Sequence, residues 1–411
     1  MMHKRRVVLT GIGVVSPLAI GKTPFWNSLI DGNVAIDRVT RFDSSGYSSQ
    51  IAAEIHGFDP SRYMERRRLQ WTDLFSQLAV VAAGLALEDA NLNVDGREGV
   101  GVYTGSALGG LAFAEDQVRK FNRDGLRVVH PLLTISVFGG AAASNIAIEF
   151  GIHGPTTANA NSCAAGTMAI GQAFHAIRNG DIDVAVAGGV EAPLAPLSFG
   201  AFTVARAMST RNGDPQRASR PFDRERDGFV MAEGSGFVVL EEYGAAVQRG
   251  ARMYAEIRGY GTSNDGHHMA APLPSGSEVA SAIRRALDDA RVSPHEIEAI
   301  NAHGSSTQAG DRAELRAYQL VFDGRASNIP VSATKSQHGH ALGATGAWEV
   351  AITALTLSEE RMPGNVNFFQ ADDGCVISCS KGATQTQAKL ALSNSSGFGG
   401  INAALVMQAV S

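Results

Sequence analysis

Segments typical of strands and helices alternate along the chain, and the same series starts again after about residue 250. Apolar strand patterns cover residues 6–15, 100–104, 184–187, 237–241, 252–259, 297–302, 329–332, 389–393 and 404–407. Helix patterns separate them, among others over residues 72–90, 132–150, 278–290, 311–322 and 342–357. Such alternation predicts parallel sheets covered by helices. We therefore expect an α/β protein built from two similar halves, residues 1–250 and 251–411.

The stretch around Cys163 has the pattern of a strand, a tight elbow and a helix. Apolar residues at three- and four-residue spacing give the segment after Cys163 one helical face, and Gly180 supplies its end. Ser162 is expected to cap this helix, which places Cys163 at its first position. The partial positive charge of a helix N-terminus favours a reactive thiolate there. The alternative is a buried cysteine that packs as a small apolar residue.

Cys163, His303 and His340 each follow a predicted strand. In α/β sheets, functional groups gather at the carboxyl ends of the strands. This placement favours the catalytic interpretation of Cys163 and predicts that the two halves meet near these three residues.

Charge and cysteine content exclude several classes of protein. A net charge of −5 over 411 residues gives no overall attraction to nucleic acid. Three cysteines cannot form a disulfide framework and fit a reducing cytoplasm. The apolar run after the basic N-terminus breaks at Thr10, which favours a first strand over a signal peptide. No apolar run is long enough to span a membrane. Cys375 and Cys379 lack a neighbouring histidine cluster, so no metal site is expected.

Five motifs, in order along the chain, carry a family resemblance. They are C-A-A-G at residues 163–166, R-P-F-D-R-E-R-D-G-F at 220–229, N-A-H-G-S-S-T-Q-A-G-D at 301–311, K-S-Q-H-G-H-A-L-G-A-T-G at 335–346 and G-F-G-G at 397–400. Over essentially its whole length the chain resembles the elongating, type II β-ketoacyl-acyl-carrier-protein synthases, including the ketosynthase subunits of type II polyketide synthases. The resemblance implies a thiolase-like fold, with duplicated βαβαβ halves in a five-layer αβαβα arrangement, and a dimer.

The resemblance also implies roles for the motif residues. Cys163 accepts the growing acyl chain as a thioester, which divides one difficult transfer into two easier ones. His303 and His340 donate N–H groups to the enolate that forms when malonyl on a carrier protein loses carbon dioxide. The backbone N–H groups of Cys163 and Phe398 form the oxyanion hole, and Phe398, flanked by glycines, acts as a gate. No cofactor on the enzyme is implied; the 4'-phosphopantetheine is carried by the acyl carrier protein.

Other residues match supporting positions of the family. Lys335 and Glu349 resemble a charge pair near the histidines, and His338 is expected at the rim of the pocket. Asp311 and Glu314 lie in a predicted first helical turn, where carboxylates suit the helix dipole, and are read as structural.

Substrate contacts are implied at Ser305 and Thr307 and along an acyl tunnel near the dimer interface. The tunnel residues expected are Leu108, Phe138 and Phe202, with Gly139 and Gly140 leaving width for a rigid chain; the alternative is that these glycines only let two helices pack closely. Because carrier proteins of this system are acidic, a basic docking surface is expected. Its candidates are Arg66, Arg67, Arg68, Arg127 and Arg206, although a solvated charged surface would have the same composition.

The chain also departs from the family pattern. Ala270 stands where a hydroxyl residue usually contacts the phosphopantetheine arm, Ser305 replaces a threonine, and Ser396 stands where phenylalanine usually precedes Gly397. These changes favour a polyketide or polyene ketosynthase that pairs with a similar but non-identical, chain-length-factor-like subunit. A housekeeping synthase of fatty-acid elongation, and a homodimer, remain alternatives.

Four rival classes fit less well. A degradative thiolase needs a second catalytic cysteine in its late motif, and Cys375 and Cys379 lie outside the glycine-rich motifs. A chain-initiating synthase has asparagine in place of His340, and a non-catalytic chain-length factor lacks Cys163. A serine hydrolase needs G-x-S-x-G, which the sequence lacks.

Overall fold

The computed structural model describes residues 4–372 and 377–410, and its centre is one mixed sheet of eleven strands. Five strands of the first part lie in the order β5-β4-β6-β8-β1. Their bounds are Val7–Val15 for β1, Val100–Gly105 for β4, Thr156–Asn159 for β5, Val184–Glu191 for β6 and Gly234–Glu242 for β8. The second part adds β9 (Ala255–Asn264), β10 (Ala299–Asn301), β11 (Pro330–Ser332), β13 (Ser378–Cys379), β15 (Leu390–Gly397) and β16 (Ile401–Gln408).

These second strands repeat the spatial order of the first five. They lie as β11-β10-β15-β16-β9, with β13 outside β11, so both sets have the order 3-2-4-5-1 when numbered along the chain. The sets join where β1 pairs antiparallel with β9, with Val7 opposite Ile257. The duplicated α/β architecture expected from the sequence is thus confirmed, whereas the division at residue 250 into two domains stays a prediction.

Purely parallel sheets were the wrong expectation for the fifth strand of each set. β8 is antiparallel to β1 and β6, and β16 is antiparallel to β15 and β9. Only residues 398–400 separate β15 from β16, and so short a connection joins antiparallel neighbours only. The strands that lead to the functional motifs, β5, β10 and β11, are parallel to their inner neighbours.

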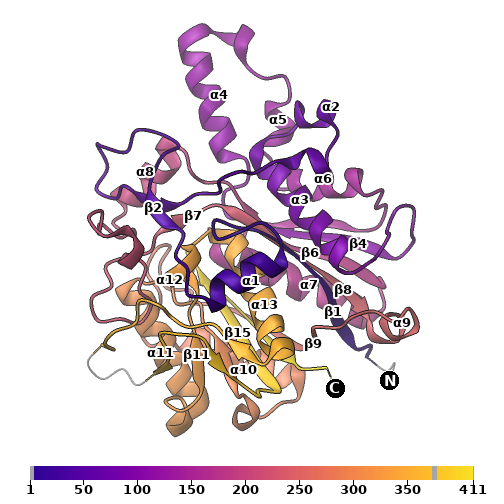
Figure 1. The fold of residues 1–411 in the computed structure, drawn as a ribbon, viewed down its shortest axis with the longest axis vertical. Coiled ribbons are helices and arrows are strands. Elements are labelled where there is room, and N and C mark those ends of the chain that lie inside the picture. The colour runs from indigo at the N-terminus through magenta and orange to yellow at the C-terminus, as the bar shows by residue number, and fades with distance from the viewer. Residues whose placement is uncertain (1–3, 373–376, 411) are drawn as a thin grey trace.

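Helices form three layers around the sheet (Figure 1). α7 (Ala165–Asn179) and α13 (Leu342–Glu359) pack together between its two halves. α3 (Leu74–Asp89) and α6 (Ala141–Glu149) cover the outer face of the first half, and α10 (Ser277–Ala290) and α11 (Gln308–Phe322) cover that of the second. This is the five-layer αβαβα arrangement, with an apolar core on each side of each half-sheet.

The two central helices meet at their N-terminal ends through small residues. A Cβ added to Gly166 would lie 2.6 Å from the carbonyl oxygen of Gly343 and 3.0 Å from the amide nitrogen of Ala347. Only glycine allows this approach. It brings the start of α7, which follows Cys163, next to the start of α13, which follows His340.

The remaining elements surround this core. They are α1 (Lys22–Ile30), α2 (Arg66–Leu69), α4 (Leu111–Asp124), α5 (Leu133–Ser136), α8 (Pro196–Val204), α9 (Tyr243–Gln248), α12 (Lys335–His338), β2 (Ile36–Arg38), β3 (Ile51–Ala53), β7 (Met231–Ala232), β12 (Arg361–Met362) and β14 (Thr384–Gln385). Short 3₁₀ turns occur at Pro60–Arg62, Leu126–Val128, Ser162–Ala164, Pro215–Arg217, Pro294–Glu296 and Asp323–Arg325.

Two helix predictions need correction. The single helix expected over residues 132–150 is divided into α5 and α6, because the chain turns at residues 137–140, where Gly139 and Gly140 lie. The helix expected from residue 72 begins at Leu74 as α3, because Asp73 is its N-cap and its carboxylate accepts from the Ser76 N–H. α4, where no helix was expected, projects from the body of the molecule (Figure 1). None of the helices in the described residues combines the length and apolar character needed to cross a membrane.

Candidate active site

Cys163 lies on the elbow between β5 and α7, in the 3₁₀ turn Ser162–Ala164. Ser162 has a left-handed backbone with φ of 52°, and its side chain caps no helix N–H. The expected N-cap is therefore wrong: the hydroxyl lies instead 3.9 Å from the Cys163 sulfur. The predicted end of the helix is confirmed, because Gly180 adopts the left-handed C-cap conformation.

The thiol of Cys163 is half-buried and is not the preformed thiolate that the helix terminus alone would favour. Burial raises the pKa of the Cys163 thiol to about 11, and the Ser162 hydroxyl and the Lys335 charge only partly oppose this effect. The cause is desolvation, which disfavours the charged form of the thiol. The free protein thus holds a protonated thiol at neutral pH.

His303 and His340 come from different elements and face each other. His303 follows β10, and His340 lies between α12 and α13. Their ring centroids are 5.4 Å apart at an interplanar angle of 83°, and Phe229 packs edge-on against His340 at 5.5 Å. Both rings are buried, and burial, with the Lys335 charge nearby, holds the pKa of each well below its usual value. Both histidines are therefore neutral at pH 7, each with one ring N–H to donate.

Buried charges hold the backbone at His303 from both sides. The Glu314 carboxylate accepts from the His303 N–H at 2.7 Å and from the Gly304 N–H at 2.8 Å. The Lys335 ammonium donates to the His303 carbonyl and pairs with Glu349. Burial raises the pKa of the Glu349 carboxyl to about 7, against the opposing effect of Lys335. Removing one member leaves another charge buried and unpaired.

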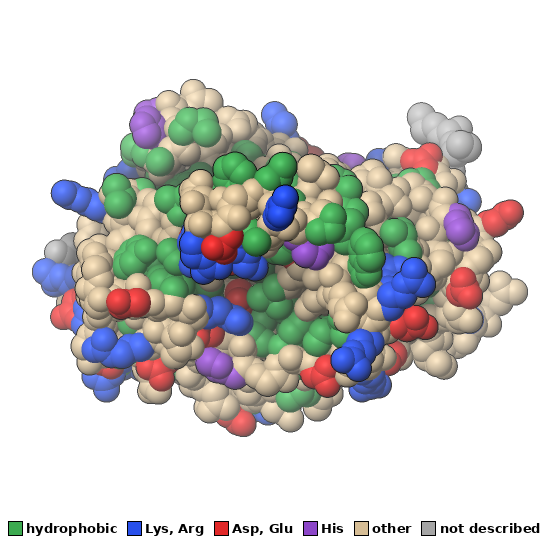
Figure 2. Space-filling model, turned by 90° about the horizontal axis from the view of Figure 1, so that it is seen from above, with side chains coloured by type: hydrophobic (Ala, Val, Ile, Leu, Met, Phe, Trp, Pro, Cys, Tyr) green, Lys and Arg blue, Asp and Glu red, His purple; other side chains and the backbone are tan. Residues whose placement is uncertain are grey.

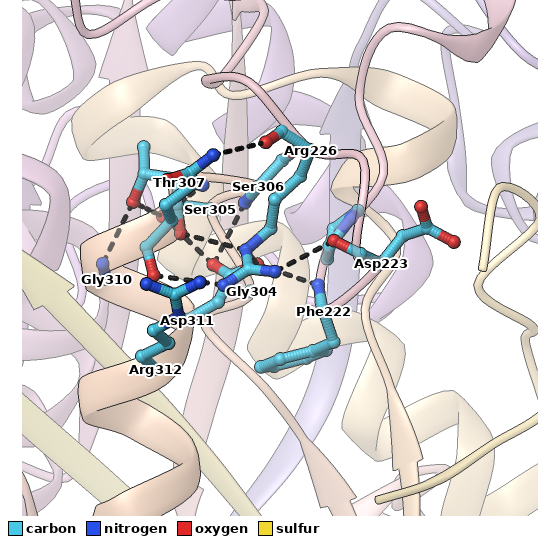
Figure 3. A network of polar contacts seen from close by, with 12 residues as sticks. Phe222, Asp223, Arg226, Gly304, Ser305, Ser306, Thr307, Gly310, Asp311 and Arg312 are labelled. Carbon is cyan, nitrogen blue, oxygen red and sulfur yellow. Dashed lines mark hydrogen bonds and ion pairs between the residues drawn. The ribbon is translucent and has the colours of Figure 1, made fainter. Parts of the chain in front are cut away.

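A second network, shown in Figure 3, orders residues 304–307. The Asp311 carboxylate accepts from the backbone N–H groups of Phe222 at 2.7 Å and Ser306 at 3.1 Å. The fully buried Arg226 lies 3.2 Å from Asp311 and also donates to the Thr307 carbonyl. Asp311 and Arg226 thereby tie the R-P-F-D segment to the loop that carries Ser305 and Thr307. Sequence reasoning gave Asp311 a structural role but did not identify Arg226.

One cavity of about 440 Å³ brings many of the expected residues together. Its walls include Cys163, His303, His340, Phe398, Ser305, Thr307, Phe202, Arg206, Ala270 and Ser396. Phe398 is partly exposed, stacks on Phe202 at 6.0 Å, and precedes two glycines with positive φ. A Cβ on Gly397 would lie 2.9 Å from the Cys163 nitrogen, so this loop lies directly against the nucleophile.

Other expected residues lie away from this cavity. Leu108 packs against the same apolar cluster as Cys163 and Phe202 without lining the cavity, and Phe138 is exposed at 47%. Arg66, Arg67 and Arg127 are exposed and distant from the cavity lining, and Arg68 pairs with Glu149 at 3.2 Å.

The expectation for His338 is wrong. His338 is fully buried, donates from Nδ1 to the Gly339 carbonyl at 2.7 Å and packs against Trp348. Because α12 turns its side chain inward, it does not reach a pocket rim.

Sequence reasoning also missed Glu191, a fully buried carboxylate at the end of β6. It accepts from the backbone N–H groups of Ala107 at 2.7 Å, Leu108 at 3.0 Å and Gly343 at 3.0 Å. Burial raises the pKa of the Glu191 carboxyl to about 7. Its position at the carboxyl end of a strand was the available signal. Glu191 fastens the loop after β4 to the start of α13.

In the described residues, no cluster of three His, Cys, Asp or Glu side chains is arranged to hold a metal ion. Cys379 packs in the core of the second half, whereas Cys375 lies outside the described residues.

Comparisons with known proteins agree with this geometry. Residues 4–246 match the family model "Beta-ketoacyl synthase, N-terminal domain", and residues 254–369 match the "C-terminal domain" of the same family. The chain is 39% identical to the 3-oxoacyl-[acyl-carrier-protein] synthase 2 of Coxiella burnetii, with 100% of both chains covered. It is 38% identical to the Synechocystis protein of the same name, with 99% of both covered.

Solved structures give the same result. A ketosynthase/chain length factor described for ishigamide has a TM-score of 0.93 at 31% identity, covering 99% of this chain and 100% of that one. A structure described as a type II PKS acyl-carrier protein in complex with its ketosynthase has a TM-score of 0.90 at 35% identity, with the same coverage. The two family domains, the full-length relatives and the thiolase-like fold show that the chain belongs to the β-ketoacyl synthase family of condensing acyltransferases.

Proposed function

We propose that this chain is a ketosynthase that condenses an acyl chain held on Cys163 with malonyl carried by acyl carrier protein, adding two carbons. The observation that carries the proposal is the shared cavity, in which one thiol and two neutral imidazoles face the same space. A nucleophile and two N–H donors are the groups that this chemistry requires.

In the first half of the reaction, the Cys163 sulfur attacks the thioester of the acyl carrier and the carrier thiol leaves. The oxyanion lies against the backbone N–H groups of Cys163 and Phe398. Support comes from Phe398, which lines the cavity together with Cys163, and from Gly397, whose missing side chain lets that loop lie against the elbow.

In the second half, malonyl carrier loses carbon dioxide and leaves an enolate. Its oxygen accepts hydrogen bonds from the His303 and His340 rings, and its carbon attacks the Cys163 thioester. The carbon–sulfur bond to Cys163 then breaks, the Cys163 sulfur leaves as a thiolate that takes up a proton, and the extended β-ketoacyl chain stays on the carrier. Neutral imidazoles suit this role, since an N–H that stays neutral stabilises the oxyanion without giving its proton away. Lys335, Glu314 and Asp311 support the histidine side of the site through backbone contacts, and Glu349 supports it by pairing with Lys335.

The carrier arm enters through the same cavity. Ser305 and Thr307 line it and have hydroxyls suited to the 4'-phosphopantetheine amides, whereas Ala270 leaves one such contact absent. No cofactor on the enzyme is part of this scheme. The relatives' names and the carrier complex among the similar structures support an acyl carrier protein as partner.

Carrier docking is proposed at the cavity mouth. Arg206 is exposed and lines the cavity, next to the exposed Val204 and Met269. Arg66, Arg67, Arg68 and Arg127 extend the proposed basic surface away from the mouth.

A dimer is supported by two exposed features. β5 is an edge strand with three exposed residues, Thr156 to Ala158. α4 and α5 expose Val118, Phe121 and Ile135, and Figure 2, which views the molecule from the end where α4 projects, shows hydrophobic side chains around a hollow. Phe138 belongs to this surface, so its proposed tunnel contact depends on the partner, which is either a second copy or a chain-length-factor-like subunit.

The pathway proposed is polyketide or polyene extension. Ser396 lines the cavity where the family pattern has phenylalanine, and the space this leaves suits a rigid chain. Fatty-acid elongation is the alternative, favoured by the names of the curated relatives.

The test is an assay with acyl and malonyl carrier protein. Wild type should form the β-ketoacyl carrier and release carbon dioxide. His303→Ala and His340→Ala should each decarboxylate malonyl about 100-fold more slowly yet still load acyl on Cys163. Unchanged decarboxylation in both variants would refute the role of the histidines. The same assay is run with saturated and with polyunsaturated acyl chains, with and without a co-encoded homologue. The type of chain that is extended distinguishes fatty-acid elongation from polyketide or polyene extension.

A further inference from the structure

The ring of His340 has a hydrogen-bond partner on the side away from the cavity. Its Nδ1 lies 3.1 Å from the hydroxyl of Thr345, one turn into α13. Thr345 is 1% exposed and His340 3% exposed, so water does not compete for this contact. His303 has no such partner: in the described part of the chain its Nδ1 is buried and unbonded.

Everything else about His340 is already fixed. Its backbone N–H donates to the Val230 carbonyl at 2.8 Å, and its carbonyl accepts from the Ala232 N–H at 3.0 Å. Its ring is held edge-on between Phe229 and His303. The one choice left to a neutral imidazole in this place is which nitrogen carries the proton.

Counting donors and acceptors decides that choice. Within the described residues, Nδ1 of His340 is the only hydrogen-bond partner of the Thr345 hydroxyl. If Nδ1 carried the proton, it would donate to the hydroxyl oxygen and leave the hydroxyl proton buried without an acceptor, which costs free energy. If the hydroxyl donates to Nδ1 instead, both groups are satisfied and the ring proton is on Nε2.

We infer that Thr345 is a positioning residue that fixes the Nε2–H tautomer of His340, so that the ring presents a donor to the cavity. The inference rests on the proposed function for its kinetic consequence, because an Nε2–H donor is what an enolate oxygen in the cavity needs. The tautomer itself is independent of that function.

The experiment compares Thr345→Val, which keeps the shape and removes the hydroxyl, with Thr345→Ser, which keeps the hydroxyl. Thr353→Val is the matched control, since Thr353 lies on the same helix and its hydroxyl only returns to the Glu349 carbonyl, at 2.7 Å. In protein labelled with ¹⁵N-histidine, the ring nitrogen shifts report which nitrogen is protonated, and the signal missing in His340→Ala assigns His340.

Wild type, Thr345→Ser and Thr353→Val should show His340 protonated at Nε2, and Thr345→Val should lose that preference while His303 is unchanged. The kcat of malonyl decarboxylation should fall about tenfold in Thr345→Val, as expected for one lost hydrogen bond. Acyl loading of Cys163 should be unaffected, and Thr345→Ser should decarboxylate malonyl at the wild-type rate. In a His340→Ala background, Thr345→Val should have no further effect.

An unchanged His340 tautomer in Thr345→Val would overturn the inference. So would a changed tautomer with unchanged decarboxylation, or an equal loss in the His340→Ala background, since either result makes the hydroxyl merely structural. If wild type does not decarboxylate malonyl at all, the proposed function fails, and the nitrogen shifts alone decide the tautomer.

Discussion

The two elbows that lead into the central helices occupy equivalent places in the two halves, yet their surroundings differ. Each follows the third strand of its set, β5 before Cys163 and β11 before Lys335 and His340. β5 pairs only with β4 and is an exposed edge, whereas β11 lies between β10 and β13. Accordingly Cys163 is half-buried on a strained turn, whereas Lys335 is buried and His340 is buried except where it lines the cavity.

This difference shows how the two halves of a duplicated fold can take different roles in one reaction. The second elbow is rigid because the chain itself supplies every neighbour, including the buried Lys335–Glu349 pair. The first elbow is open to substrates and to any partner that covers β5. Changes at the first elbow should therefore affect chemistry or assembly, whereas changes at the second should affect stability in addition to the chemistry of His340.

The largest expected effect is on chemistry at the first elbow. Cys163→Ala removes the acyl acceptor, so covalent loading and condensation should be lost, a fall of more than about 1,000-fold, while thermal stability stays close to wild type. Mass spectrometry of peptides after incubation with acyl carrier protein measures the loading. Cys379→Ala is the control, because burial raises the pKa of the Cys379 thiol to about 12 and it should take no acyl group. Acyl mass on a peptide containing Cys375 or Cys379 would contradict the assignment.

The second elbow should show the largest effect on stability. Lys335→Met leaves the Glu349 carboxylate and the His303 carbonyl without their buried donor, and urea unfolding should show a loss of about 3–5 kcal/mol. Lys389→Met is the matched control: its pair with Glu360, at 3.6 Å, is exposed and should contribute less than about 1 kcal/mol. Adding Glu349→Gln to Lys335→Met should recover part of the loss. Equal effects of Lys335→Met and Lys389→Met would remove the contrast between the elbows.

The sequence predicted the residues of these elbows better than their surroundings. The motifs identified Cys163, His303 and His340 as neighbours, and the alternation of elements predicted two similar halves, although not the order of the strands within the sheet. Burial was harder to foresee: the pKa of Cys163 and the position of His338 depend on residues far away in the chain. Arg226 and Asp311 are 85 positions apart in the chain, and no local pattern in the sequence shows such a pair.

Because the first elbow is open on one side, we expect substitutions on the exposed apolar surface of α4 to weaken the dimer. Phe121→Asp together with Val118→Asp places two charges on the exposed apolar face of α4, where these residues are 48% and 55% exposed. If this face and β5 form the dimer interface, the dissociation constant should rise by at least about 30-fold, as for a lost hot spot, and sedimentation should show monomer. Leu320→Asp, at a 48% exposed position of α11, should leave assembly unchanged. A dimer that survives the α4 changes would place the interface elsewhere.

The smallest expected effect concerns Ser162, whose hydroxyl lies 3.9 Å from the Cys163 sulfur. Burial raises the pKa of this thiol to about 11, and the hydroxyl opposes that effect by donating to the thiolate. Below the pKa the thiolate fraction rises tenfold with each pH unit, so alkylation of Cys163 by iodoacetamide should accelerate steadily from pH 7 to 10. Ser162→Ala should shift this profile to higher pH and slow alkylation at pH 8 about three- to tenfold, as expected for one modest hydrogen bond. The rate is followed on the Cys163 peptide, and in urea both proteins should alkylate alike. A profile unchanged in the folded variant would mean that the hydroxyl does not reach the thiolate, and that the exposure of the first elbow, not its polar neighbour, sets the reactivity of Cys163.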